Sequence, residues 1–429
     1  MTATRAAPLA APFRGLVPFG DSELDALLFF GRERETEIAV ANLLAARLTI
    51  LYGPSGVGKS SLLRAGVARR VRELGSRRAI GRGPDGAAVV FASWADDPVR
   101  DLAEAIADEV TSLVKRPVAR PAPGTPLVDV VEHWTNVLDG SLYLVLDQLE
   151  EYFVYHEAGG PGTLEHELPE VVQRPRLRAN VLLSLRDDAL AQLDVFKARL
   201  PNLFANYLRL DRLDRAAATA AIVGPVKRWN ELVPAEQRVE IEPVLVDAVL
   251  AQAAVAAEPD RIEPPYLQLV LERLWNEEGE RGSRVLRAST LAELGGAEAI
   301  VREHLDRALA VLDEREQDAA ALMFDHLVTP SGTKIAHRVT DLAQFAHVPE
   351  AEAATMLAVL GGERIVRPLD EGSGGGDRYE IFHDVLGAAV IDWQGRHQLA
   401  AERARARRRQ PTRHRSRVRW RARIDGSAT

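Results

Sequence analysis

Short apolar runs alternate with amphipathic stretches along the first half of the chain. Four runs are apolar or β-favouring at nearly every position: residues 48–52, 87–92, 142–147, which ends in Asp147, and 181–185. Strands of this kind are buried on both faces of a sheet, and the stretches between them have the periodicity of helices. The pattern predicts an α/β core, in which a parallel sheet carries helices on both faces.

The second half of the chain has a different pattern. Residues 212–308 are rich in alanine and predict helices alone, over 216–229, 244–256 and 266–275. Such amphipathic helices bury one face against each other, so this region is expected to form a helical domain beside the core.

A third pattern begins at residue 309. Three helices are predicted over residues 317–327, 339–345 and 350–360, and two strands follow at 364–369 and 378–382. The residues between these strands, 371–377, are mostly glycine and predict the tip of a hairpin. Helices followed by such a hairpin are typical of a winged-helix domain.

The most specific motif lies between the first predicted strand and the helix after it. Gly53, Gly58, Lys59 and Ser60 match the phosphate-loop pattern G-x-x-x-x-G-K-[ST]. Glycines let the backbone curl until several N–H groups point inward, toward a phosphate at the helix N-terminus. A chance match in a Gly-rich turn is the alternative, and the flanking strand and helix disfavour it. The predicted nucleotide-binding residues are Gly53, Pro54, Ser55, Gly56, Val57, Gly58, Lys59, Ser60 and Ser61.

These patterns divide the chain into five parts. We expect an N-terminal lead-in at 1–18, a P-loop nucleotide-binding domain at 19–211, a helical lid domain at 212–308, a winged-helix domain at 309–398 and an Arg-rich tail at 399–429. A chain of 429 residues is too long for one compact core, so several domains agree with its length.

Composition excludes several classes of site. The chain has no cysteine, which rules out disulfides and thiolate metal sites. No run of apolar residues is long enough to span a membrane, so we expect a cytoplasmic protein. The net charge of −8 hides an asymmetry, because residues 401–429 hold eleven arginines against Glu402 and Asp425. A basic tail on an acidic body is either a segment that binds nucleic acid or a solvated extension.

The carboxyl ends of the predicted strands carry candidate catalytic residues. In a parallel sheet the ligand lies at these ends, where Gly53, Asp147 and Arg186 all fall. Asp147 is expected to hold Mg²⁺ together with Ser60, although a strand-end turn would also use an aspartate. The residue that follows is Gln148, which cannot accept a proton as a glutamate at this position would. This argues for slow hydrolysis of ATP.

Three further residues complete the catalytic set that begins with Lys59 and Asp147. Glu150 and Glu151 follow closely and are candidates to act near the γ-phosphate, although neither occupies the usual position. Arg186 is a candidate sensor of the γ-phosphate. The alternative is an arginine paired with Asp187 or Asp188.

The ordered set of motifs resembles one known family. Residues 30–33 (Phe-Gly-Arg-Glu), the loop at 53–61, residues 146–153 (Leu-Asp-Gln-Leu-Glu-Glu-Tyr-Phe) and residues 185–188 resemble the STAND NTPases, in particular their bacterial conflict-associated branch, called novel STAND. That branch has Asp-Gln-Phe-Glu-Glu where this chain has Leu149 in the place of Phe. Residues 265–268 (Pro-Tyr-Leu-Gln) and 379–386 (Tyr-Glu-Ile-Phe-His-Asp-Val-Leu) are similar to its later motifs, with Asp384 replacing a glutamate.

The resemblance implies a role for each matching residue. Gly31 and Arg32 would lie beside the adenine, and Pro265 would pack near the base from the helical lid. Lys59, Ser60 and Ser61 would hold phosphate and Mg²⁺. His383 would reach the β-phosphate from the winged-helix domain in a closed, ADP-bound state. The alternative for His383 is a core histidine between a strand and a helix.

Two classes of function stay open. The first, implied by the resemblance, is an ATP/ADP-operated switch with weak ATPase activity, which self-associates when ATP is bound and answers an unknown protein trigger or effector. The second is a nucleic-acid-binding ATPase of the initiator type, which would use the winged helix and the basic tail. Residues 350–360, the expected recognition helix, contain no Arg or Lys, which favours the switch. Family members commonly continue past the winged helix, so we expect a shortened homologue or one that has lost its sensor part.

Overall fold

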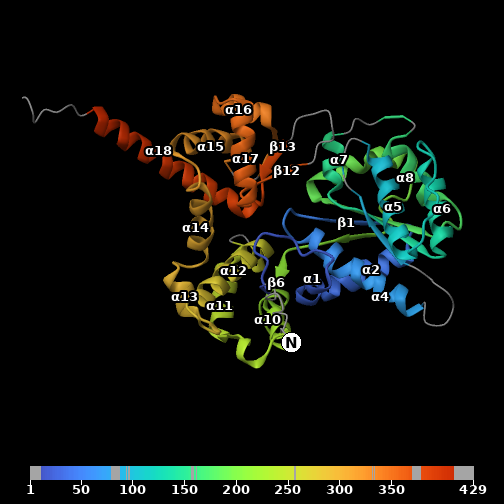
Figure 1. Ribbon diagram of the computed structural model, residues 1–429, viewed down its shortest axis with the longest axis horizontal. Coiled ribbons are helices and arrows are strands. Elements are labelled where there is room, and N and C mark those ends of the chain that lie inside the picture. The colour runs from blue at the N-terminus through green and yellow to red at the C-terminus, as the bar shows by residue number, and fades with distance from the viewer. Residues whose placement is uncertain are drawn as a thin grey trace, which may run out of the picture.

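The computed structural model describes residues 11–78, 87–92, 94, 97–155, 159–160, 162–255, 258–330, 332, 334–369 and 378–409. Within these ranges the chain forms three lobes: a core, a lid and a winged-helix lobe (Figure 1). Among the helices described, none combines the length and apolar character that crossing a membrane requires.

The core lobe is built on a parallel sheet of five strands in the order β2-β3-β4-β1-β5. Four of these strands were predicted, and the short edge strand β5 was not. The strands are β1 (Leu48–Gly53), β2 (Ala87–Phe91), β3 (Ser141–Leu146), β4 (Ala179–Arg186) and β5 (Tyr207–Arg209).

Alternate residues of the central strands bury their side chains on opposite faces of the sheet. Leu142, Leu144 and Leu146 of β3 pack into one apolar cluster, whereas Tyr143 and Val145 pack into another. The prediction of a sheet covered on both faces is therefore confirmed. The helices of this lobe are α1 (Glu23–Leu28), α2 (Glu33–Ala45), α3 (Lys59–Ser61), a π-helical stretch (Leu62–Ala68), α4 (Arg69–Arg78), α5 (Pro98–Val114), α6 (Leu127–Leu138), α7 (Leu149–Tyr155), α8 (Leu164–Gln173) and α9 (Asp194–Lys197).

The lid lobe contains the predicted helices and two small sheets that were not predicted. Strands β6 (Leu213–Asp214), β9 (Glu258–Ile262) and β8 (Ala254–Val255) form an antiparallel sheet, and β7 (Glu240–Ile241) pairs with β10 (Val285–Leu286). The helix predicted to reach residue 256 ends at Gln252, because β8 follows. The helices are α10 (Arg215–Leu232), α11 (Pro243–Gln252), α12 (Pro264–Glu280), α13 (Ala288–Glu293) and α14 (Ala297–Leu309).

The winged-helix lobe matches its predicted plan. Helices α15 (Glu314–Leu327), α16 (Val339–Ala346) and α17 (Glu350–Gly362) are followed by the hairpin of β12 and β13, and the short strand β11 between α15 and α16, which was not predicted, completes an antiparallel sheet in the order β11-β13-β12. Its strands are β11 (His337–Arg338), β12 (Val366–Leu369) and β13 (Arg378–Ile381), and the predicted hairpin tip lies outside the described residues.

A long C-terminal helix was not predicted. Helix α18 (Gly387–Arg409) runs through the boundary expected at 398/399 and points away from the other lobes (Figure 1). The rest of the expected tail, 410–429, lies outside the described residues.

The N-terminal lead-in packs between the lobes. Phe13 is 2% exposed and joins the apolar cluster of the lid, whereas Leu16 is buried in the cluster of the winged-helix lobe. The backbone N–H of Arg14 donates to the Gln268 side-chain oxygen of α12 (3.1 Å). Residues 11–19 therefore help to form the junction of the lobes.

Candidate functional site

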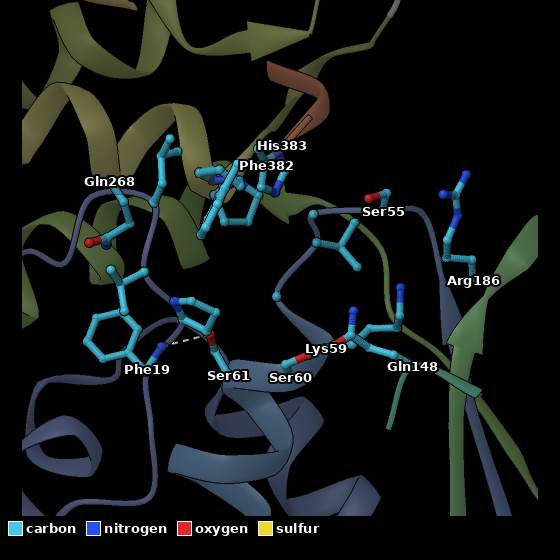
Figure 2. A pocket seen from close by; sticks show the side chains of 18 of the residues that line it. Phe19, Ser55, Lys59, Ser60, Ser61, Gln148, Arg186, Gln268, Phe382 and His383 are labelled. Carbon is cyan, nitrogen blue, oxygen red and sulfur yellow. Dashed lines mark hydrogen bonds between the residues drawn. The ribbon is translucent and has the colours of Figure 1, made fainter. Parts of the chain in front are cut away.

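A cavity of about 450 Å³ lies where the three lobes and the lead-in meet. Its charged part is lined by Lys59, Glu150, Glu151, Arg186, Lys334, Arg367, Glu380 and His383. Its apolar part is lined by Leu16, Val17, Pro18, Phe19, Leu28, Phe29, Phe30, Leu213, Pro264, Pro265 and Leu267. Figure 2 shows Phe19 and Gln268 toward one end, Gln148 and Arg186 toward the other, and His383 opposite the phosphate loop.

The phosphate loop joins β1 to α3 at the floor of this cavity. Ser55, Gly56, Val57, Gly58, Lys59, Ser60 and Ser61 all line it. Gly56 has φ +78° and Gly58 has φ +92°, left-handed conformations that glycine adopts without a steric penalty. The loop therefore has the curled backbone that its sequence predicts.

Lys59 is 8% exposed, and its ammonium group donates to the carbonyl oxygens of Gly53 (2.9 Å) and Pro54 (3.0 Å). Burial lowers the pKa of Lys59, while the nearby carboxylates of Glu150 and Asp147 act in the opposite direction. The carbonyls hold a buried cation at the entrance of α3, within the charged part of the cavity.

The two serines after Lys59 have different surroundings. Both line the cavity (Figure 2). The Ser61 hydroxyl accepts a hydrogen bond from the backbone N–H of Phe19 (3.1 Å), which ties the lead-in to the phosphate loop. Ser60 is the hydroxyl that the motif assigns to a metal ion.

Four predicted site residues lie behind the cavity wall: Gly31, Gly53, Pro54 and Asp147 are not among the residues that line it. Gly31 has φ +86°, and a Cβ atom there would lie 2.3 Å from the carbonyl oxygen of Ala217 in α10. The close approach of lid helix α10 therefore leaves no room for a side chain at position 31.

Arg32 connects the core to the start of the lid through hydrogen bonds. It is 4% exposed, and its guanidinium donates to the carbonyl oxygens of Val57 (2.9 Å) and Asp211 (2.7 Å) and pairs with Glu35 (2.9 Å). These contacts hold the phosphate loop against the start of the lid. A contact with the adenine stays a prediction.

Asp147 and Gln148 form a tight turn at the end of β3. The backbone N–H of Gln148 donates to the Asp147 carboxylate (3.0 Å), and Gln148 has φ 55°, a left-handed conformation unusual for a residue with a side chain. The indole N–H of Trp94 donates to the Asp147 carbonyl oxygen (2.6 Å). This strained turn places the first turn of α7 at the edge of the cavity.

Glu150 and Glu151 face different lobes. Glu150 accepts a hydrogen bond from the backbone N–H of Arg186 (3.2 Å), and burial raises its pKa against the opposing effect of Lys59. Glu151 accepts a hydrogen bond from the Gln148 amide (2.8 Å) and lies 3.6 Å from Arg367 of β12. Burial raises the pKa of Glu151 to about 7, although Arg367 opposes the shift. The sequence could not separate these two candidates.

Arg186 lies at the end of β4 on the cavity wall. Its guanidinium donates to both carboxylate oxygens of Asp188 (3.1 and 2.7 Å). The ion pair with Asp188, one of the two alternatives for Arg186, is therefore present. A role as a sensor of the γ-phosphate stays a prediction.

His383 follows β13 and meets the phosphate loop directly. A Cβ atom at Gly56 would lie 2.1 Å from Cε1 and 2.6 Å from Nε2 of His383, so the ring packs on the bare glycine backbone. Pro265 lines the apolar part from the first turn of α12. The two residues that the resemblance assigned to the other lobes therefore line the same cavity as Lys59.

Sequence reasoning missed two groups of lining residues. Residues 15–19 of the lead-in line the apolar part of the cavity. The charged part is lined by Lys334, Arg367 and Glu380 of the winged-helix lobe. No motif marked the lead-in, Lys334 or Arg367, and Glu380 lies within the motif at 379–386 but had no role assigned to it. The burial of Leu16 and Phe19 agrees with their apolar character, which was the available signal for the lead-in.

The residues present fit a nucleotide with its metal ion. The apolar part can accept a base, and the curled loop with Lys59 can accept phosphates. A Mg²⁺ ion of this kind uses few protein ligands besides the phosphates. Ser60 lines the cavity and would be one of them, whereas the Asp147 carboxylate lies behind the wall and accepts the Gln148 N–H, so its role as a ligand stays a prediction. No group of three or more His, Cys, Asp or Glu side chains that could hold a metal alone occurs in the described ranges.

Comparison with known proteins gives one family and a set of distant structures. The sequence model of the family described as "Novel STAND NTPase 1" matches residues 12–424. Among proteins with curated functions, none matches this sequence.

Among solved structures, the Aeropyrum pernix ORC2 protein in its ADPNP–ADP complexes is 13% identical, with a TM-score of 0.47, and the match covers 86% of this chain and 94% of that one. The Aeropyrum pernix ORC1 protein in complex with DNA is 18% identical, with a TM-score of 0.45, over 92% and 100% of the chains. Pyrobaculum aerophilum Cdc6p is 14% identical, with a TM-score of 0.42, over 85% and 94%. At these identities no function is transferred from them.

Proposed function

The chain belongs to the novel STAND NTPase 1 family, and from this premise we propose that it is an ATP/ADP-operated molecular switch. In the proposed cycle ADP holds the three lobes together, and exchange for ATP lets the winged-helix lobe move away. The open protein then associates with further copies of itself in a signalling or defence response.

One observation carries this proposal: the His383 ring packs on Gly56 of the phosphate loop although it belongs to another lobe. A phosphate chain bound by this loop would contact Lys59 from below and His383 from above. A ligand shifts a conformational equilibrium only by its different affinity for the two states. Contacts from two lobes supply such a difference, because only the closed arrangement offers both.

Each part of the nucleotide has candidate partners. Pro265 and the lead-in would pack on the base, Arg32 and Gly31 would shape the adjoining wall, and Lys59 and Ser61 would bind phosphates. Ser60 and Asp147 would hold Mg²⁺, which neutralises phosphate charge when bound.

Hydrolysis is proposed to be slow. Gln148 occupies the position next to Asp147 and cannot accept a proton. Glu150 is the better candidate base, since it lies beside Lys59 and burial raises its pKa, which makes its carboxylate a stronger base. Arg186 would contact the γ-phosphate if its pairing with Asp188 rearranged.

The test is mass photometry of the full chain with ADP or with a non-hydrolysable ATP analogue. We expect monomers with ADP and larger assemblies with the analogue, and Lys59→Ala should stay monomeric in both. Monomers under both conditions would overturn the switch.

A second candidate, an ATPase of the initiator type, has one feature in its favour, the arginines of residues 401–429. Helix α17 of the winged-helix lobe contains no Arg or Lys, which disfavours DNA contact through it. DNA-shift assays with and without residues 401–429 distinguish the candidates. DNA binding that is lost with the tail supports the initiator-type ATPase.

The proposed switch also includes an unknown protein trigger or effector and a cytoplasmic location.

A further inference from the structure

The core and the winged-helix lobe meet at a set of buried and partly buried charges beside the cavity. Glu151 belongs to the first turn of α7, whereas Lys334, Arg367 and Glu380 belong to the winged-helix lobe. The side chains of Lys334 and Glu380 are 5% and 8% exposed, and those of Glu151 and Arg367 are 18% and 29% exposed. Charges at this depth depend strongly on their partners.

Within the winged-helix lobe Arg367 is in excess. Glu380 accepts hydrogen bonds from Lys334 and from Nε of Arg367 (2.7 Å). Among the described residues, both of these cations bind Glu380, so Lys334 alone can balance its charge. Nη2 of Arg367 lies 2.6 Å from Glu380 and 3.6 Å from Glu151 of the core, so one guanidinium bridges carboxylates of the two lobes.

On the core side of this junction, the charge in excess is negative and belongs to Glu151. Its nearest polar partner there is the neutral amide of Gln148 (2.8 Å), and the carboxylate of Glu150 is its neighbour in the chain. The cation that faces Glu151 comes from the other lobe. A buried carboxylate without its cation is strongly destabilised. Each lobe therefore supplies the charge that the other lacks.

We propose that Arg367 is a positioning residue that binds Glu151 across the lobe boundary and holds the winged-helix lobe against helix α7. The proposal rests on the switch described above and names a contact that regulates it. Because α7 begins two residues after Asp147, this contact couples the position of the winged-helix lobe to the carboxylates at the phosphate end of the cavity. It also keeps Glu151 directed away from the phosphate loop.

The test compares Arg367→Gln in two backgrounds, the parent chain and Glu151→Gln. Lys334 continues to balance Glu380 in these variants, so the winged-helix lobe is expected to fold, and thermal unfolding checks this. Arg338→Gln is the matched control, since it removes one positive charge from an exposed position of the same small sheet. Arg367→Lys retains the charge and should retain most of the closure.

The readout is the distance between the lobes, measured by pulsed electron paramagnetic resonance. The chain has no cysteine, so Ser112→Cys and Thr355→Cys, both exposed, give one defined pair of spin labels. In the parent background we expect Arg367→Gln to raise the open fraction about ten-fold. In the Glu151→Gln background the same change should have less than about a two-fold effect, because the partner charge is gone.

An equal effect in both backgrounds, or none in either, would overturn the proposal. The measurement is made first without nucleotide, so it remains valid even if the chain does not bind ADP. Failure of the switch and failure of this contact are thereby distinguished. Release of a fluorescent ADP analogue, measured next, should become faster in Arg367→Gln and stay at the parent rate in Arg338→Gln.

Discussion

The two charged walls of the cavity are constructed in different ways. The phosphate-loop wall comes from one continuous segment, residues 55–61, between a buried strand and a helix. The wall opposite comes from four separated positions of the winged-helix lobe: Lys334, Arg367, Glu380 and His383. The first wall is determined locally and belongs to the sheet. The second exists only while its lobe is docked, which is the property that the proposed switch requires.

The burial of the two walls agrees with this difference. Strand β1 lies between β4 and β5 in the sheet, and its residues Ile50 and Leu51 are fully buried. In the part of the chain that the structure describes, the winged-helix wall contacts the core through the His383 ring against Gly56 and the pairing of Arg367 with Glu151. A few contacts of this kind can be broken at modest cost, whereas the phosphate loop cannot move without disturbing the sheet.

The largest expected effect concerns the phosphate-loop wall. Lys59→Ala should weaken ADP binding by more than about 100-fold, because it removes a buried ammonium group that would form charge-assisted hydrogen bonds with phosphates. Isothermal titration calorimetry measures the change. Exposed Lys197→Ala is the control and should bind as the parent does. Unchanged affinity in Lys59→Ala would remove this wall from the binding site.

The next effect separates the two neighbouring carboxylates. Glu150→Gln should lower steady-state ATP turnover about 100-fold, the usual effect of losing a general base, because Glu150 lies beside Lys59. Glu151→Gln should retain most of the turnover, since Glu151 faces Arg367. Phosphate release measures both. The reverse order would show that Glu151 turns toward the nucleotide during hydrolysis.

A smaller effect tests whether the two walls touch. Gly56→Ala introduces a Cβ atom that would meet the His383 ring, and it also forces a left-handed conformation that costs about 1–2 kcal/mol. Thermal unfolding and ADP affinity should both fall. In a His383→Ala background the steric part is relieved and only the backbone cost remains. If Gly56→Ala has the same effect in both backgrounds, His383 does not pack on the loop in solution.

The smallest effect is a pH dependence from Glu151 of helix α7. Burial raises the pKa of Glu151 to about 7, so the folded chain binds a proton there more tightly than the unfolded chain does, although Arg367 opposes the shift. This contribution to stability is fully present below the ordinary pKa of a glutamate and is lost as the pH rises through about 7, where the pairing of the ionised carboxylate with Arg367 offsets part of the loss. The thermal unfolding midpoint should therefore fall from about pH 6 to about pH 8 in the parent and fall less in Glu151→Gln. Identical pH profiles of the two proteins would contradict this contribution.

Much of the core could be predicted from the sequence, because its signals are local. The runs at 48–52 and 142–147 are apolar on both faces, and the loop between Gly53 and Ser61 has a fixed spacing. Each signal needs only its own neighbours to be interpreted. The winged-helix plan was also visible, because helical stretches are followed by two short strands with a Gly-rich segment between them.

The missed features depend on contacts distant in sequence. Strands β6, β7 and β10 have two residues each, which is too short for a period to be seen. The Arg-rich composition of α18 resembles an unstructured end, although the helix reaches Arg409. Lys334 and Arg367 are ordinary surface residue types, and only the docking of two lobes brings them to the cavity. No single-sequence pattern records such docking.

The measurement that tests the account most directly is the distance between the labelled lobes at saturating ADP and at a saturating ATP analogue, in the parent and in His383→Ala. The account predicts a narrow, short distance distribution with ADP, a longer one with the analogue, and the loss of this difference in His383→Ala. The same distribution with both nucleotides in the parent would contradict the claim that the bound nucleotide decides whether the lobes stay together.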